Sequence, residues 1–167
     1  MGDRARCTLA LSGELTKADH DKLLARLRAL NPEEESGSWE DESGSWFNFG
    51  EVNYADMANL DPALECDLIA LGVSFAWSWD AGFEYGPGVR LFIPRLGPTP
   101  LVFSALDEEI ALPVLRVKYN PAALKTAIEY GEAWCEVLNG GLAVMCTPEP
   151  AIGGGVGSAI EIMSEGD

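Results

Sequence analysis

The chain has 167 residues, with 27 aspartates and glutamates against 11 lysines and arginines and a single histidine, so its formal net charge is −16. Its length and its 47% hydrophobic content are typical of one folded domain, 1–167. The charge repels phosphate groups, which argues against direct binding to nucleic acid and against docking on an anionic membrane surface.

The N-terminal half is expected to alternate strands with helices. Residues 6–11 alternate in hydropathy and predict a first strand. Thr16 is expected to cap a helix over 17–30, with an acidic residue three positions later as in a capping box. The aromatic-rich residues 46–54 predict the next strand. An Asp-Pro pair then predicts a short helix over 62–71, which a glycine closes.

Two hairpins are predicted in the middle of the chain. Their strands are residues 73–79 with 89–93, and residues 101–106 with 110–119. Residues 73–79 alternate large apolar with small side chains, which is typical of a half-exposed antiparallel strand. Pro113 places the last of these strands at a sheet edge or a bulge, because proline has no backbone N–H to donate.

An Asn-Pro pair at 120–121 begins the longest predicted helix, which extends to about residue 138. Helical spacing predicts a core stripe made of Leu124, Ile128, Gly131, Cys135 and Leu138. A neighbouring polar stripe consists of Lys125, Glu129, Glu132 and Glu136. Residues 142–146 predict a strand, and residues 148–167 form a glycine-rich segment that is expected to be partly flexible.

These elements predict an α+β fold in a single domain. The sheet is expected to be mainly antiparallel, with about five to seven strands and three helices packed on one face.

The acidic residues are concentrated in one part of the chain. Residues 32–67 contain eleven acidic side chains and no lysine or arginine, and the pentad Glu-Ser-Gly-Ser-Trp occurs twice, at 35–39 and at 42–46. Glycines and serines favour turns, so residues 31–45 predict an acidic Ser/Gly/Trp loop. One interpretation is a well-solvated loop. The other is a binding surface, since tryptophan is enriched at interface hot spots and a spacer needs none.

The leading hypothesis is therefore a non-enzymatic inhibitor that mimics nucleic acid. Duplex DNA carries one charge per 1.7 Å, so eleven carboxylates match about 19 Å of duplex. The expected partner is a basic protein, such as a nucleic-acid-acting enzyme or complex of the host, as with anti-restriction, anti-CRISPR or nuclease-inhibitor proteins. The predicted partner-binding residues are Glu33, Glu34, Glu35, Trp39, Glu40, Asp41, Glu42, Trp46, Glu129, Glu132 and Glu136.

Two other functions remain open on the sequence. An immunity protein or antitoxin that neutralises a toxin would use the same acidity. A small enzyme or ligand-binding domain would instead use an aromatic hairpin pocket around Trp77, Trp79, Asp80 and Glu84. The acidity also has a plain interpretation as an aid to solubility.

No catalytic residue, metal site or cofactor is predicted. His20 is the only histidine, and a position on a helix between two aspartates favours a packed or capping role. The cysteines have no zinc spacing, and Cys7, Cys135 and Cys146 have the apolar neighbours typical of buried thiols. Neither a secretory signal nor an apolar run of about 18 residues is present, so a cytoplasmic location is expected.

Overall fold

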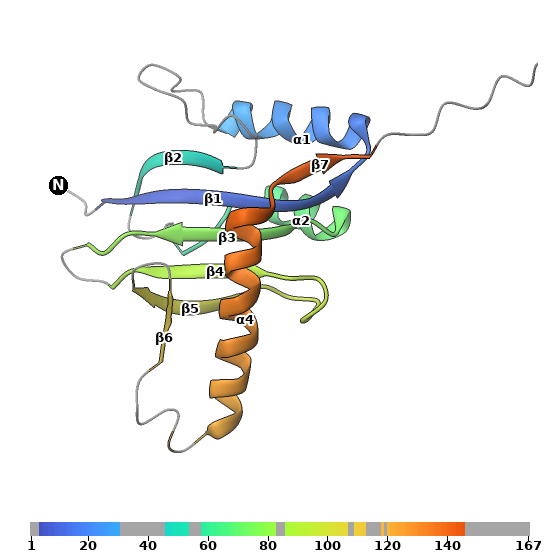
Figure 1. The fold of residues 1–167 in the computed structure, drawn as a ribbon. Helices are drawn as coiled ribbons and strands as arrows, with labels where there is room; N and C mark the ends of the chain where they lie inside the picture. Colours follow the sequence, from blue (N-terminus) through green and yellow to red (C-terminus); the bar gives the residue numbers. More distant parts are fainter. Residues whose placement is uncertain are drawn as a thin grey trace, which may run out of the picture.

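The computed structural model describes residues 4–30, 46–53, 58–82, 86–106, 109–112, 118 and 120–145. These residues form a mostly antiparallel sheet and three α-helices, which confirms the α+β class (Figure 1). The strands are β1 (Arg4–Leu15), β2 (Trp46–Asn53), β3 (Ser74–Trp79), β4 (Gly88–Phe92), β5 (Leu101–Leu106), β6 (Glu109–Ala111) and β7 (Leu142–Val144). The helices are α1 (Lys17–Leu30), α2 (Pro62–Leu71) and α4 (Pro121–Gly140).

The sheet is built around β1, which is twice as long as the predicted strand over 6–11. The strand order is β2-β1-β3-β4-β5-β6, and β7 pairs with the end of β1 in parallel. All other pairs are antiparallel, so the predicted hairpins of β3 with β4 and of β5 with β6 are confirmed. β6 lies at the sheet edge but ends at Ala111, well short of the strand predicted over 110–119, and residues 113–117 lie outside the described part.

The predicted starts of α1 and α2 are confirmed by their hydrogen bonds. The Asp19 backbone N–H donates to Thr16 Oγ1 over 3.2 Å, and the Thr16 hydroxyl donates to the Asp19 carboxylate. The Leu64 N–H donates to Asp61 Oδ1 over 2.8 Å, with Pro62 in the first turn. α2 ends at Gly72, whose φ of 68° lies in the left-handed region that glycine tolerates best. Local chemistry therefore fixes these boundaries.

One face of the sheet is covered by α1 and α2. Alternate residues of β1 and β3, among them Leu11 and Phe75, are fully buried in a cluster with leucines of both helices. Leu27 of α1 and Leu64 of α2 are likewise completely buried there. β1 and β3 thus direct their larger apolar side chains to this face, because successive side chains of a strand alternate between the two faces.

The expectation that all three helices share one face is wrong, because α4 covers the opposite face. In Figure 1, α4 crosses in front of the strands. Tyr130 and Trp134 of α4 form a second buried cluster with Ala10 of β1, Ala76 of β3 and Leu91 of β4. β3 is therefore not half-exposed: its small side chains leave room for a helix with large aromatic residues rather than facing water.

The core stripe of α4 also differs from the predicted one. Ala127, Tyr130, Ala133, Trp134 and Val137 are buried, whereas Leu124 is 42% and Ile128 52% exposed. Both stripes are apolar and have helical spacing, so periodicity alone does not distinguish them. The wide Tyr130 and Trp134 rings fill the space above the alanines of the sheet. Leu138 of the predicted stripe still packs against this cluster, whereas Leu124, Ile128 and Cys135 are left at the surface.

None of the helices formed by the described residues is long and apolar enough to cross a bilayer.

Candidate partner-binding surface

Most of the predicted partner-binding residues lie outside the described residues. These are Glu33, Glu34, Glu35, Trp39, Glu40, Asp41 and Glu42. We refer to residues 33–42 as the acidic segment. The structure does describe Trp46, which follows this segment closely, and the three glutamates of α4.

Trp46 connects the acidic segment to α4. It is the first residue of β2, where it pairs with Ala10 of β1, and its half-buried indole packs against the cluster beneath α4. Its Nε1–H donates to the Leu138 carbonyl over 3.3 Å. The Trp46 indole is therefore held against the C-terminal part of α4, so part of its surface is used inside the fold.

The glutamates of α4 differ in their neighbours. The Glu129 carboxylate lies 3.7 Å from the Lys125 ammonium, and Glu136 pairs with Arg95 over 2.5 Å. Glu132 is exposed and has no ion pair with any described residue. Exposed pairs of this kind contribute little stability, about 0–1 kcal/mol, so a partner's cations can replace them at small cost. Among the described residues, no strong interaction therefore occupies the glutamates of α4.

Three acidic residues of the lysine-free and arginine-free window 32–67 are used inside the fold. Arg26 of α1 pairs with Asp67 and approaches Asp61, both of which belong to α2 and its cap. Arg90 of β4 binds Glu65 of α2 through two hydrogen bonds. These three carboxylates help to hold α2 in place. The candidate partner-binding surface therefore consists of the acidic segment and the glutamates of α4, and these three residues do not belong to it.

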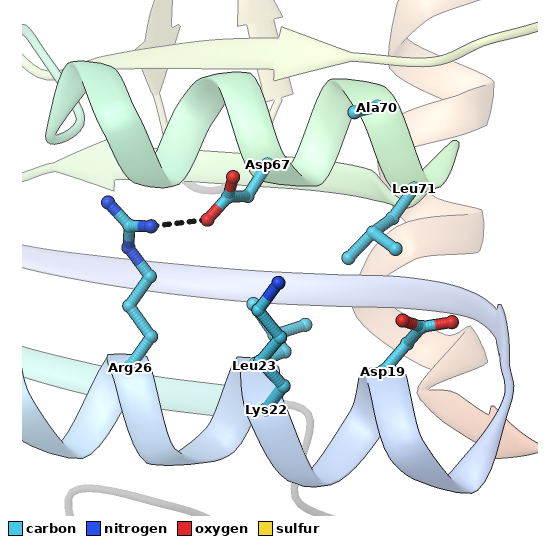
Figure 2. Close-up of a pocket in the computed structure, with 7 residues that line it drawn as sticks. All are labelled: Asp19, Lys22, Leu23, Arg26, Asp67, Ala70 and Leu71. Atoms are coloured by element: carbon cyan, nitrogen blue, oxygen red, sulfur yellow. Dashed lines mark hydrogen bonds and ion pairs between the residues drawn. The ribbon is translucent and has the colours of Figure 1, made fainter.

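A pocket of about 340 Å³ lies between α1 and α2, and sequence reasoning did not identify it (Figure 2). Its apolar wall consists of Leu23 and Leu71, while Arg26 reaches across it to Asp67. Asp19, at its rim, is engaged with the Thr16 hydroxyl. Its guanidinium and both of its carboxylates are already bound, and Lys22 is the remaining charged side chain of the lining. The pocket is therefore mainly an ion-paired junction of two helices.

A second groove, of about 420 Å³, separates α4 from β6. Its apolar lining includes Leu124 and Ile128, the residues that the sequence assigned to the core, and the carboxylates at its margin belong to Glu109 and Glu132. We refer to it as the α4–β6 groove. Sequence reasoning missed it because the same apolar spacing had been used to predict the buried face of the helix.

The aromatic hairpin does not present its tryptophans to a ligand. Trp77 and Trp79 are 3% and 7% exposed, and the Trp77 ring packs edge-on against Phe49 with 5.1 Å between ring centroids. Asp80 is exposed, and Glu84 lies outside the described residues. Both indoles are therefore part of the hydrophobic core.

The described residues include three free cysteines. Cys7 is buried, whereas Cys66 and Cys135 are exposed, so the prediction of a buried Cys135 is wrong. The reason is again that α4 buries the stripe with Tyr130 and Trp134, which leaves Cys135 on the exposed side. In the described part of the chain, no three histidine, cysteine or acidic side chains are grouped to hold a metal ion.

Comparison with protein-family models, with curated proteins and with solved structures finds no match to this chain.

Proposed function

We propose that this protein is an acidic inhibitor that mimics nucleic acid and blocks the basic, nucleic-acid-binding surface of a partner protein. The observation that carries the proposal is the position of the acidic segment in the chain. Six carboxylates with no lysine or arginine among them lead into Trp46, which is bound to α4, and α4 carries three more glutamates. The hydrogen bond of Trp46 to α4 supports the proposal that the acidic segment and these glutamates act together.

Charge density gives the size of surface that this arrangement imitates. The window contains eleven acidic residues, and three of the described ones are paired inside the fold. The six carboxylates of the acidic segment correspond to about 10 Å of duplex DNA. A surface of this length fits one DNA-contacting patch rather than an extended groove.

The folded scaffold supports the proposal on energetic grounds. Trp46 fixes one end of the acidic segment, and α1, which ends at Leu30, leads into the other end. A loop anchored at both ends loses less conformational freedom on binding than a free acidic tail does, so more of the electrostatic attraction appears as affinity.

The test begins with capture of a partner. The immobilised chain is exposed to host lysate at low salt, and proteins that salt releases are identified by mass spectrometry. Binding of each purified candidate to a fluorescent DNA duplex is then measured by anisotropy as the chain is added. The expected result is displacement of the duplex, with an apparent affinity that falls steeply as salt rises.

A matched pair of triple variants assigns the effect to the acidic segment. Glu40, Asp41 and Glu42 are changed to lysine in one protein. In the other, the exposed Glu14, Asp21 and Asp80 are changed to lysine, so both have the same net charge. Loss of displacement in the first variant alone supports the proposal. Equal loss in both variants, or binding that leaves the duplex in place, contradicts it.

A further inference from the structure

The α4–β6 groove exposes apolar side chains that the fold leaves without cover among the described residues. Leu124 and Ile128 are one helical turn apart and are 42% and 52% exposed. With Leu112 they form much of an apolar wall, and Cys135 extends it along α4. Large apolar side chains that are contiguous and exposed mark interaction surfaces, whereas isolated ones need no explanation.

The charged side chains that line the groove in the described part of the chain have one sign. Glu109 of β6 and Glu132 of α4 both line it, and neither forms an ion pair with a described residue. Among the described residues, the lining includes no lysine or arginine. An occupant that carries cations beside its apolar side chains therefore gains electrostatic energy that a neutral or acidic occupant does not.

The negative charge of the groove lining argues against two other occupants of the groove. A second copy of the chain has a net charge of −16 and would bring the same two glutamates against each other. Residues 146–167 of the same chain contain four carboxylates and no lysine or arginine, so they too are repelled. Of these three occupants, the described lining favours a different molecule, of opposite charge.

We propose that the α4–β6 groove docks an amphipathic basic segment of a partner protein. Two apolar side chains of that segment, one helical turn apart, pack on Leu124 and Ile128, and flanking lysines or arginines pair with Glu109 and Glu132. This is the arrangement by which amphipathic helices bind apolar grooves. The inference rests on the proposed function in one respect, since both require a basic partner, but it concerns residues outside the acidic segment.

Cys135 offers a direct reporter of occupancy because it lines the groove and is exposed. Cys66 of α2 is also exposed but belongs to a helix on the opposite face of the sheet, so it serves as an internal control. Alkylation by uncharged iodoacetamide is followed at each cysteine by mass spectrometry, in the full chain with Cys146→Ser.

The probe is a synthetic helical peptide of about 16 residues, with leucines on one face and lysines on the other. At about ten times its Kd, alkylation of Cys135 is expected to slow about tenfold, since only the free protein reacts. Alkylation of Cys66 is expected to keep its rate. A peptide with serine in place of leucine and a peptide with glutamate in place of lysine are expected to protect neither cysteine.

Variants separate the groove from general charge attraction. The double variant Leu124→Ser with Ile128→Ser is expected to bind the peptide about tenfold more weakly. Leu30 of α1 is exposed to a similar extent as Leu124, and Leu30→Ser is expected to leave the affinity for the peptide unchanged. Three results overturn the proposal: the serine peptide protects Cys135 equally well, the leucine peptide also protects Cys66, or the double variant binds the peptide with an unaltered Kd. So does a free protein in which Cys135 is already protected and becomes reactive on dilution, because the occupant is then a second copy.

The same variants distinguish this inference from the proposed function. If the groove variants keep full binding to a captured partner and to the peptide while the acidic-segment variant loses the partner, the groove inference fails and the proposed function stands. If the peptide protects Cys135 as expected but no DNA-binding protein is displaced from its duplex, the proposed function fails and the groove remains a binding site.

Discussion

Arg90 of β4 holds Glu65 of α2 through two parallel hydrogen bonds. Arg90 Nε donates to Glu65 Oε2 over 2.7 Å, and Nη2 donates to Oε1 over 2.8 Å. The side chains are only 23% and 16% exposed. The hydrogen bonds that Arg90 donates to Glu65 raise the pKa of Arg90 above its usual value, against the opposing effect of partial burial. A bidentate pair of this kind fixes both distance and orientation, so it sets how α2 lies on the sheet.

Removing one member of this pair is expected to cost more than removing both. Arg90→Met leaves the Glu65 carboxylate partly buried without its donors, and the free energy of unfolding should fall by about 2 kcal/mol. Arg90→Met with Glu65→Met should recover much of that loss, because no charge is left unpaired. Urea denaturation of Arg90→Met, Glu65→Met and the double variant completes the cycle. Strictly additive effects would contradict a direct coupling.

Gly88 of β4 is expected to tolerate no side chain. A Cβ at this position would lie 2.2 Å from the Trp79 ring of the neighbouring strand. Gly88→Ala must therefore displace a buried indole, and we expect a loss of about 2 kcal/mol in the free energy of unfolding. Gly86→Ala is the matched control, since nothing lies within 4 Å of its Cβ, and it should change stability by less than about 0.5 kcal/mol. Thermal or urea unfolding compares them, and equal effects would contradict this packing.

Stability is expected to fall at alkaline pH because of Cys7. Burial, and secondarily the Asp80 charge, raises the pKa of this thiol from 9.0 to about 12. Below pH 9 the thiol is protonated in both the folded and the unfolded state. As pH rises from about 9 toward 12, the unfolded state loses this proton first, so unfolding becomes progressively easier. Urea midpoints across this range should decline more steeply for the natural chain than for Cys7→Ala.

Thiol reactivity gives an independent check at neutral pH. Cys66 and Cys135 should react with a thiol reagent in the folded protein, whereas Cys7 should react only after urea unfolding. Rapid modification of Cys7 in the folded state would contradict its burial and the pKa argument together.

The two tryptophans of the pentad repeat are expected to act in different ways. Trp46→Phe removes the hydrogen bond to the Leu138 carbonyl and should lower the free energy of unfolding by about 1 kcal/mol. Trp39 belongs to the acidic segment, and Trp39→Phe is expected to leave stability unchanged while it weakens binding to the captured partner. Denaturation and the anisotropy assay measure both effects. The reverse pattern would assign the partner contact to Trp46 and the structural role to Trp39.

Features decided by neighbours in the chain could be read from the sequence. The caps at Thr16 and Asp61 depend on hydrogen bonds that span three residues, and both are present. The alternation of β3 is equally local, because successive side chains of a strand point to opposite faces. The charge asymmetry around the acidic segment is also a property of the sequence alone, and it is what carries the proposed function.

The tertiary structure decided which apolar stripe of α4 enters the core. The sequence offers two stripes, one with Leu124 and Ile128 and one with Tyr130 and Trp134, and helical periodicity permits either. The choice depends on Ala10 and Ala76, which come from strands far away in the chain and leave space for aromatic rings on their face of the sheet. Because that space exists only once β1 and β3 have paired, no local signal could place α4 on that face or leave Leu124 and Ile128 exposed beside β6.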